Sequence, residues 1–216
     1  MSRVRAILQR VRGPSVLDVG CTGYAGEHIE ARHWVHRHLR EKFTDVAGID
    51  LNADLVRVMT ERGYKDVSVA DAEDLQLDRT FDTIVAGQIM EHLSNPGRFL
   101  ECCRRHLVPG GRLVVTVPYP FALVYLVYAL FKYPRTSSEP THTLWFCPGT
   151  MRTLAAHAGF EVRHTELVED YLPGVYKSAK YTLSCWLVRI LRFLPMRLRG
   201  NCALFVLERS RAGVPT

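Results

Sequence analysis

The sequence predicts an α/β fold: a doubly wound, mostly parallel sheet with helices on both faces. Two observations predict it. Short apolar runs alternate with segments of helical periodicity, and the first run breaks into a glycine-rich turn where a helix is expected to begin. The length of 216 residues suits one domain of this class, so residues 1–216 are expected to form a single domain.

The glycine-rich turn follows the first apolar run. Residues 16–19 read as a buried strand that ends in Gly20, Cys21 and Gly23. Glycine lets a ligand approach the backbone closely, and free N–H groups at a helix start can receive negative or polar ligand groups. A nucleotide-like cofactor is the natural ligand, although a glycine turn alone is not specific for one.

The next elements alternate between helix and strand. Apolar residues recur at helical intervals over 27–43, and the histidines of this helix are interpreted as a solvated, partly packed face because no carboxylate or cysteine is arranged with them. Further helices are expected over 53–61, capped by Asn52, and from Pro96 to about Leu107, capped by Asn95. Strands are expected over 46–50, 67–70, 81–86, 112–117, 160–168 and 202–207.

Polar or flexible residues follow the first four strands, 16–19, 46–50, 67–70 and 81–86, and parallel strands bring such positions to one edge of the sheet. Ligands of doubly wound sheets bind outside the carboxyl ends of the strands. Asp50 can accept hydrogen bonds from both hydroxyls of a ribose, and Asp71 can accept one from the exocyclic amine of adenine. Each carboxylate could equally cap a helix. The succession of strand ends favours the ligand interpretation.

Charge and cysteine content exclude several classes of protein. The formal net charge is +6, but residues 171–216 carry eight bases and one acid, whereas the first 170 residues carry 20 bases and 21 acids. This asymmetry does not indicate a general nucleic-acid surface. Six cysteines without metal-ligand spacing favour reduced thiols, and no apolar run approaches the roughly 20 residues that a membrane span needs. A cytoplasmic protein is expected.

With these residues in place, the chain resembles the class I S-adenosylmethionine-dependent methyltransferases, of the small-molecule type related to quinone-biosynthesis enzymes. The resemblance runs from about residue 16 to 160 and implies a Rossmann-like, seven-stranded sheet whose last strand is antiparallel. It rests on Val-Leu-Asp-Val-Gly-Cys at 16–21, Gly-Ile-Asp at 48–50, Ala-Asp-Ala-Glu-Asp-Leu at 70–75, Phe-Asp at 81–82 through Glu-His-Leu at 91–93, Leu-Val-Pro-Gly-Gly at 107–111, and the segment 145–160.

The resemblance implies S-adenosylmethionine as the cofactor and assigns a part of it to each strand end. Where the family usually has a glycine two places after Gly20, this chain has Thr22, so the turn is expected to be reshaped. The cofactor residues are Asp18, Gly20 and Gly23 at the methionine part, Asp50 at the ribose, Asp71 and Ala72 at the adenine, and Gln88 beside the sulfonium. Cys21 and Leu51 are also expected to bind the cofactor.

Methyl transfer from a sulfonium is an in-line displacement on an activated carbon, so the protein mainly aligns the reactants and excludes water, with an optional base. The candidate bases are His92 and His142, and the alternative for each is a packed or capping histidine. Gln88, Tyr119 and Trp145 are expected to line the acceptor pocket, and no metal site is expected. Cys21 is interpreted as a small packing residue.

Two other activities are disfavoured. A dehydrogenase needs G-x-G-x-x-G, whereas the glycines here fall at 20, 23 and 26. Methylation of a nucleobase amine is disfavoured because residues 86–89 read Ala-Gly-Gln-Ile, without the Asn/Asp-Pro-Pro-aromatic run typical of those enzymes. The expected function is O-methylation of a small molecule, including an apolar or lipid-linked one. The alternative is a non-catalytic or cofactor-sensing binding protein on the same fold.

Residues 119–145 and 171–200 are expected to be apolar or basic insertions that form a lid or an interface. Residues 121–131 are apolar all round, and 184–198 mix apolar side chains with arginines, as an interfacial helix does. A second interpretation, compatible with a lid, is a peripheral membrane surface at 184–198. The sequence indicates no particular oligomeric state.

Overall fold

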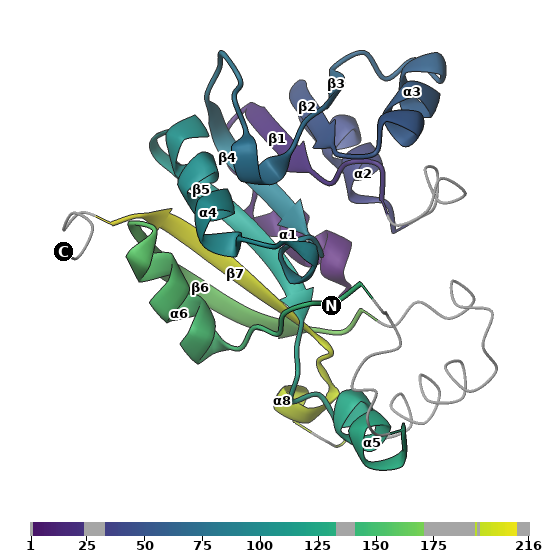
Figure 1. Ribbon diagram of the computed structural model, residues 1–216, viewed down its shortest axis with the longest axis vertical. Coiled ribbons are helices and arrows are strands. Elements are labelled where there is room, and N and C mark those ends of the chain that lie inside the picture. Colours follow the sequence, from purple (N-terminus) through teal and green to yellow (C-terminus); the bar gives the residue numbers. More distant parts are fainter. Residues whose placement is uncertain (1, 24–32, 133–140, 171–192, 194, 211–216) are drawn as a thin grey trace.

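The computed structural model of the protein describes residues 2–23, 33–132, 141–170, 193 and 195–210 (Figure 1). These residues contain a seven-stranded sheet in the order β3-β2-β1-β4-β5-β7-β6. All neighbouring strands are parallel except that β7 runs antiparallel to both β5 and β6. The predicted fold class is therefore confirmed. The strands are β1 (Ser15–Val19), β2 (Asp45–Asp50), β3 (Val67–Val69), β4 (Phe81–Gly87), β5 (Leu107–Pro118), β6 (Phe160–Val168) and β7 (Cys202–Arg209).

The strand order reverses between β1 and β4. From β1 the chain proceeds outward to β2 and β3, then returns to place β4 on the other side of β1. Such a reversal opens a crevice at the carboxyl ends of the two central strands. The central strands are apolar on both faces because each face is covered by helices, and Leu17 and Ile84 are fully buried.

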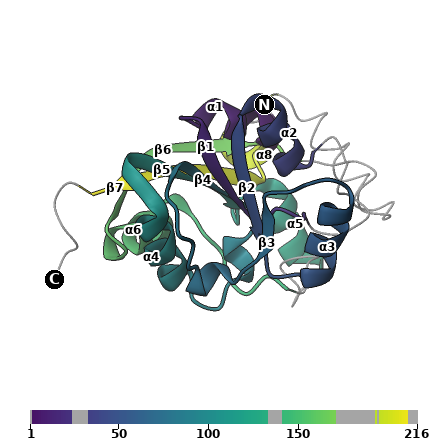
Figure 2. The same cartoon turned by 90° about the horizontal axis from the view of Figure 1, so that it is seen from above.

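Helices cover both faces of the sheet, and Figure 2 shows α1 and α2 on one face with α4 and α6 on the other. Each face has its own apolar core, one containing Ile7 and Leu39, the other containing Phe99 and Phe205. The helices are α1 (Arg3–Arg10), α2 (Val35–Lys42), α3 (Ala53–Glu61), α4 (Pro96–His106), α5 (Leu123–Lys132), α6 (Pro148–His157) and α8 (Met196–Arg199), with short 3₁₀ turns η2 (Ala72–Asp74) and η3 (Met90–His92).

Local signals predicted two helix starts correctly. The Asn52 side chain accepts a hydrogen bond from Leu55 N–H at 3.1 Å, and the Asn95 side chain accepts one from Arg98 N–H at 3.0 Å. Both are N-caps that satisfy an otherwise unbonded amide of the first turn. The strand expected over 112–117 instead begins at Leu107, so the Pro-Gly-Gly run at 109–111 lies within the bounds of β5.

Of the expected helix over 27–43, the structure describes residues 33–43, in which α2 spans Val35–Lys42; residues 24–32 lie outside the described part of the chain. Trp34 is extended, with φ −74° and ψ 114°, and its indole N–H donates to the carbonyl of Cys21 at 2.7 Å. This bond ties Trp34 to the glycine turn, and α2 begins at the next residue.

Candidate functional site

The strand ends that the sequence placed at one edge do lie at the carboxyl edge of the sheet. Asp50 is the last residue of β2, next to the turn that leaves β1, and Gln88 follows β4 directly. Asp71 follows β3, the outer strand. The ligand contacts assigned to these residues remain predictions, and the structure shows what each side chain contacts within the protein.

The amides of the glycine turn are bonded within the protein. Gly20 and Cys21 N–H both donate to the carbonyl of Ile49, at 2.8 and 3.0 Å, and Thr22 N–H donates to Asp50 Oδ2 at 3.2 Å. The expectation of free N–H groups is therefore wrong for these three positions. The turn is anchored to β2, and a ligand must meet its outer surface or displace these bonds.

Glycine is required where the turn bends. Gly20 and Gly23 have φ of +76° and +73°, in the left-handed region that favours glycine. Cys21, between them, is 1% exposed and packs with Trp34 and Met59. Burial raises the pKa of the Cys21 thiol. The interpretation of Cys21 as a packing residue is confirmed.

Thr22, the departure from the family pattern, bonds directly to Asp50. Its hydroxyl donates to Asp50 Oδ2 at 2.7 Å, in addition to the amide bond, and Asn52 N–H donates to Oδ1 at 2.9 Å. A carboxylate has about four lone-pair positions. Three donors already occupy the carboxylate that is predicted to hold a ribose, so a diol must compete with the Thr22 hydroxyl.

Replacing Thr22 by valine is expected to strengthen binding of S-adenosylhomocysteine, the demethylated cofactor, by about tenfold. The reason is that a competing hydrogen bond to a charged group, about 1.5 kcal/mol, is removed. Isothermal titration calorimetry measures the change. Thr22→Ser keeps the hydroxyl and is the matched control, with affinity near that of the parent. Unchanged or weaker binding by the valine variant would show that the hydroxyl does not compete.

Asp18 lies beneath the turn. It is 3% exposed, and its Oδ2 is 3.1 Å from Nδ1 of His36, which is completely buried. Burial raises the pKa of the Asp18 carboxyl, and the hydrogen bond to His36 counteracts part of that rise. The interpretation of the histidines as a solvated face is thus wrong for His36, because Asp18, far from it in sequence, provides the polar partner that the helix itself lacks.

Asp71, Ala72 and Leu51 surround the outer part of the edge. Asp71 Oδ1 accepts a hydrogen bond from Glu73 N–H at 2.8 Å and so caps η2, as the alternative interpretation stated. Ala72 is buried, whereas Leu51 is 71% exposed. Leu51 follows Asp50 directly, so an exposed apolar side chain adjoins that carboxylate at the edge of the sheet.

Gln88 has a strained backbone. Its φ of 61° is positive, which is uncommon for a residue with a side chain and costs on the order of 1 kcal/mol. The strain is held by a bond from Gln88 N–H to the carbonyl of Thr116 at 2.8 Å, and the side-chain amide donates to Cys202 Sγ at 3.4 Å. Strain of this kind concentrates at binding sites, which agrees with the predicted position beside the sulfonium.

The two candidate bases lie together. His92 is in η3, shortly after β4, and His142 comes from the segment between α5 and α6. The rings of His92 and His142 are 4.8 Å apart and edge to face, and Thr141 Oγ1 lies 3.0 Å from His92 Nδ1. The carbonyl of Glu91 holds the segment that carries His142, because it accepts hydrogen bonds from Thr143 N–H at 2.9 Å and from Thr143 Oγ1 at 3.1 Å.

Aromatic side chains extend from this pair. Trp145 lies 6.2 Å from the His142 ring and 5.1 Å from the Tyr125 ring, both edge to face. Tyr119 instead packs edge to face on Phe121, at 5.6 Å, and its N–H donates to the carbonyl of Asn201. Trp145 is thus adjacent to a candidate base, and no described ring contact joins Tyr119 to either histidine.

Glu91 is a buried carboxyl at the site that was not among the predicted site residues. This side chain is 1% exposed, and neither carboxylate oxygen has a hydrogen-bond partner among the described residues. Burial raises the pKa of Glu91 to about 8. An acid in an otherwise apolar stretch, next to a histidine, is the sequence signal that could have drawn attention to it.

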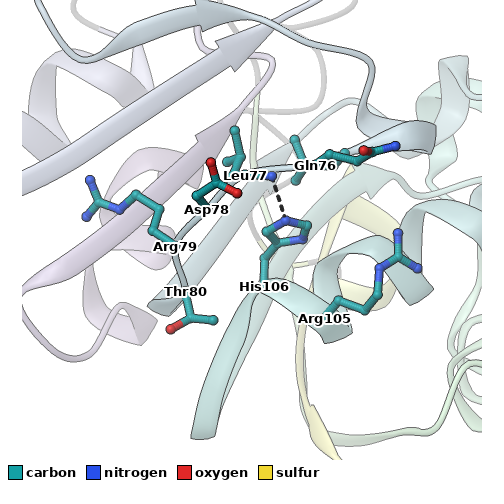
Figure 3. Close-up of a pocket in the computed structure, with 8 residues that line it drawn as sticks. Gln76, Leu77, Asp78, Arg79, Thr80, Arg105 and His106 are labelled. Atoms are coloured by element: carbon teal, nitrogen blue, oxygen red, sulfur yellow. Dashed lines mark hydrogen bonds between the residues drawn. The ribbon is translucent and has the colours of Figure 1, made fainter.

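A separate depression of about 490 Å³ lies at the opposite edge of the sheet (Figure 3). It is lined by residues 75–80, Arg105 and His106, and Leu77 N–H donates to His106 Nε2 across it at 3.0 Å. Thr80 immediately precedes β4 and His106 immediately precedes β5, so this depression is at the amino ends of the strands. It is remote from the candidate site.

A sequence family described as a methyltransferase domain matches residues 2–165, most of the chain. The chain belongs to this methyltransferase family. The family match agrees with the carboxyl-edge geometry, in which Asp71 after β3, Asp50 at the end of β2, the turn after β1 and Gln88 after β4 follow the order of the strands in the sheet.

Curated relatives and solved structures agree with this membership. The chain is 33% identical over 122 residues to the ubiquinone biosynthesis O-methyltransferase of Xanthomonas oryzae pv. oryzae, covering 51% of this chain and 47% of that protein. It is 27% identical over 199 residues to the Paracidovorax citrulli protein of the same name, covering 82% and 79%. The matched region covers only about half, or less, of the length of the first curated relatives.

A crystal structure of an S-adenosylmethionine-dependent methyltransferase from Archaeoglobus fulgidus is similar in fold. It superimposes with a TM-score of 0.63 at 19% identity, covering 96% of this chain and 91% of that one. At this identity the similarity shows the shared fold.

Proposed function

We propose that the chain transfers a methyl group from S-adenosylmethionine to an oxygen atom of a small-molecule acceptor. The observation that carries the proposal is the position of Asp50, at the end of β2 and hydrogen-bonded to the turn that leaves β1. A carboxylate there suits a ribose diol. Family membership and relatives named O-methyltransferases support the reaction and the acceptor atom.

In this proposal the cofactor extends from Asp71 and Leu51 to Gln88, which brings the sulfonium near η3. The His92 and His142 pair then faces the reacting end, and Trp145 forms an apolar wall beside it. The acceptor oxygen attacks the methyl carbon as the bond from that carbon to sulfur breaks, giving a methyl ether and S-adenosylhomocysteine. A histidine of this pair can accept the hydroxyl proton as a general base, because a ring nitrogen of neutral imidazole is a proton acceptor.

The acceptor is proposed to be apolar, bound under a lid formed by residues 119–145 and 171–200, of which 133–140, 171–192 and 194 lie outside the described residues. Helices α5 and α8 contact each other beyond the carboxyl ends of β4 and β5 (Figure 1). Large apolar side chains there are exposed, with Leu130 at 78% and Phe193 at 79%. Such exposure is typical of a surface that meets an apolar ligand or partner.

Turnover of methyl-labelled S-adenosylmethionine tests the function. The panel of acceptors comprises phenols and catechols with and without a long alkyl chain. We expect a labelled methyl ether and stoichiometric S-adenosylhomocysteine, with alkylated acceptors preferred. Cofactor binding without any labelled product, including against a metabolite extract, would favour the cofactor-sensing alternative.

We also propose that residues 184–198 bind the surface of a membrane peripherally. Most of this segment lies outside the described residues, and among the described helices none is long and apolar enough to cross a bilayer. We expect the protein to sediment with anionic liposomes, and replacing Arg189, Arg192 and Arg197 by glutamine should reduce this several-fold because each basic residue is attracted to the negative surface. Sedimentation with neutral liposomes is the control. Equal binding by the triple variant, or no binding by the parent, would contradict the contact.

A further inference from the structure

The carboxylate of Glu91 lacks a partner that its burial requires. Both oxygens are inaccessible to solvent, and neither accepts a hydrogen bond from any described residue. Arg3, whose charge acts on Glu91, is bonded through Nε to Asp170 at 2.8 Å. A buried carboxylate is costly unless it is paired, hydrogen-bonded or bound to a metal. The proposed methyl transfer with a histidine base gives Glu91 no role.

Two histidines approach this carboxylate. One ligand atom from each of Glu91, His92 and His142 can be chosen so that all three lie within 4.8 Å of one another. His92 follows Glu91 directly in η3, and His142 is brought there because Thr143 is bonded to the Glu91 carbonyl. Thr141 Oγ1 contacts His92 Nδ1, which fixes the ring and leaves Nε2 for a ligand.

We propose that Glu91, His92 and His142 bind a divalent metal ion beside the acceptor pocket. Three protein ligands from two segments are typical of catalytic metal sites, in which the remaining positions are open to water or substrate. Two imidazole nitrogens and one carboxylate suit Mn²⁺, Fe²⁺, Co²⁺ or Zn²⁺ better than Mg²⁺ or Ca²⁺, which prefer all-oxygen sets.

The metal ion supplies a way to activate the acceptor, and this part of the inference rests on the proposed function. An acceptor hydroxyl that coordinates the ion loses its proton to solvent at a lower pH, as metal-bound water does. The resulting oxygen forms the bond to the methyl carbon while the carbon–sulfur bond breaks. His92 and His142 then act as ligands, and neither is needed as a base.

Cobalt titration of the untagged, chelator-treated protein tests the site without requiring activity. Co²⁺ alone is expected to bind with a stoichiometry of one and to give visible absorption bands characteristic of nitrogen and oxygen ligands. Glu91→Gln, His92→Ala and His142→Ala should each weaken binding at least about tenfold. His157→Ala, which removes an exposed histidine from α6, is the matched control and should leave binding unchanged.

The thermal stability of Glu91→Gln gives a second readout in case a histidine variant fails to fold. Replacing the buried carboxyl by an amide of the same shape should leave the metal-free protein folded while abolishing the rise in melting temperature that Zn²⁺ gives the parent. No saturable Co²⁺ binding by the parent, or equal binding by Glu91→Gln and His142→Ala, would overturn the site.

Activity separates this inference from the proposed function. Methyl transfer that continues undiminished in protein shown to be metal-free by elemental analysis would overturn the metal's role and leave the function standing. Metal binding by a protein that does not bind S-adenosylhomocysteine would leave the metal site standing and overturn the proposed function.

Discussion

Replacing Asp50 by alanine is expected to weaken binding of S-adenosylhomocysteine by about a hundredfold. A ribose diol can donate two hydrogen bonds to this carboxylate, and bonds to a charged group contribute about 1.5 kcal/mol or more each, so the loss is about 3 kcal/mol. Isothermal titration calorimetry gives the affinity. Asp50 is the best position for this test because it joins the end of β2 to Thr22 in the turn.

Asp54→Ala is the matched control for Asp50. Asp54 is an exposed aspartate in the first turn of α3, close to Asp50 in sequence but paired only at the surface with Arg57, at 3.3 Å. Its replacement should leave cofactor affinity unchanged. Because Asp50→Ala also removes the bonds to Thr22 and Asn52, thermal unfolding must show that the variant is folded. A folded Asp50→Ala protein with parental affinity would refute the assignment of the ribose.

Replacing Gly48 by alanine is expected to lower the free energy of unfolding by about 1–3 kcal/mol, as overpacking in a core does. Gly48 lies in β2 beside Asp18 of β1. A Cβ at this position would lie 2.8 Å from Cβ and Sγ of Cys21 and 2.8 Å from Cε1 of His36. The turn and the buried histidine must therefore both move, and binding of S-adenosylhomocysteine should weaken as well.

Urea denaturation measures the Gly48 effect, and Gly97→Ala is its control. Gly97 lies in the first turn of α4, where a Cβ would have its closest described neighbour, Asn95 Oδ1, at an ordinary 3.5 Å. Alanine is favoured over glycine in helices, so this change should be neutral or stabilising by up to about 1 kcal/mol. Similar losses in the two variants would show that close packing behind the turn is not the cause.

Gly48 and Asp50 both support the glycine turn that leaves β1. The Gly-Ile-Asp run of β2 supports the turn from behind through Gly48, receives its amides at Ile49, and holds Thr22 at Asp50. A side chain at Gly48 and the loss of the carboxylate at Asp50 therefore disturb the same turn by different physical means, one by volume and one by charge.

The amino-acid sequence determined the elements and the edge. Apolar runs with strand periodicity predicted the strands, and Asn52 and Asn95 predicted helix starts, because periodicity and capping depend on residues only a few positions apart. Parallel strands separated by helices then placed Asp50, Asp71 and Gln88 at one edge, since the carboxyl ends of such strands share it. Helix α1 was not predicted, because its many basic residues obscure the short apolar pattern that includes Ala6 and Ile7. These two side chains are buried only when the helix packs on the sheet.

The tertiary structure alone decided which side chains meet within that edge. The pairs Thr22–Asp50 and Asp18–His36 join positions 28 and 18 residues apart, and the approach of His142 to Glu91 and His92 depends on a loop held by a backbone carbonyl. Local propensity carries no information about such distances, because they are set by the packing of whole strands and segments. Four strand ends were predicted from the sequence. The hydrogen bonds that occupy the carboxylate of Asp50, and the lack of a partner for that of Glu91 among the described residues, became visible only in the folded chain.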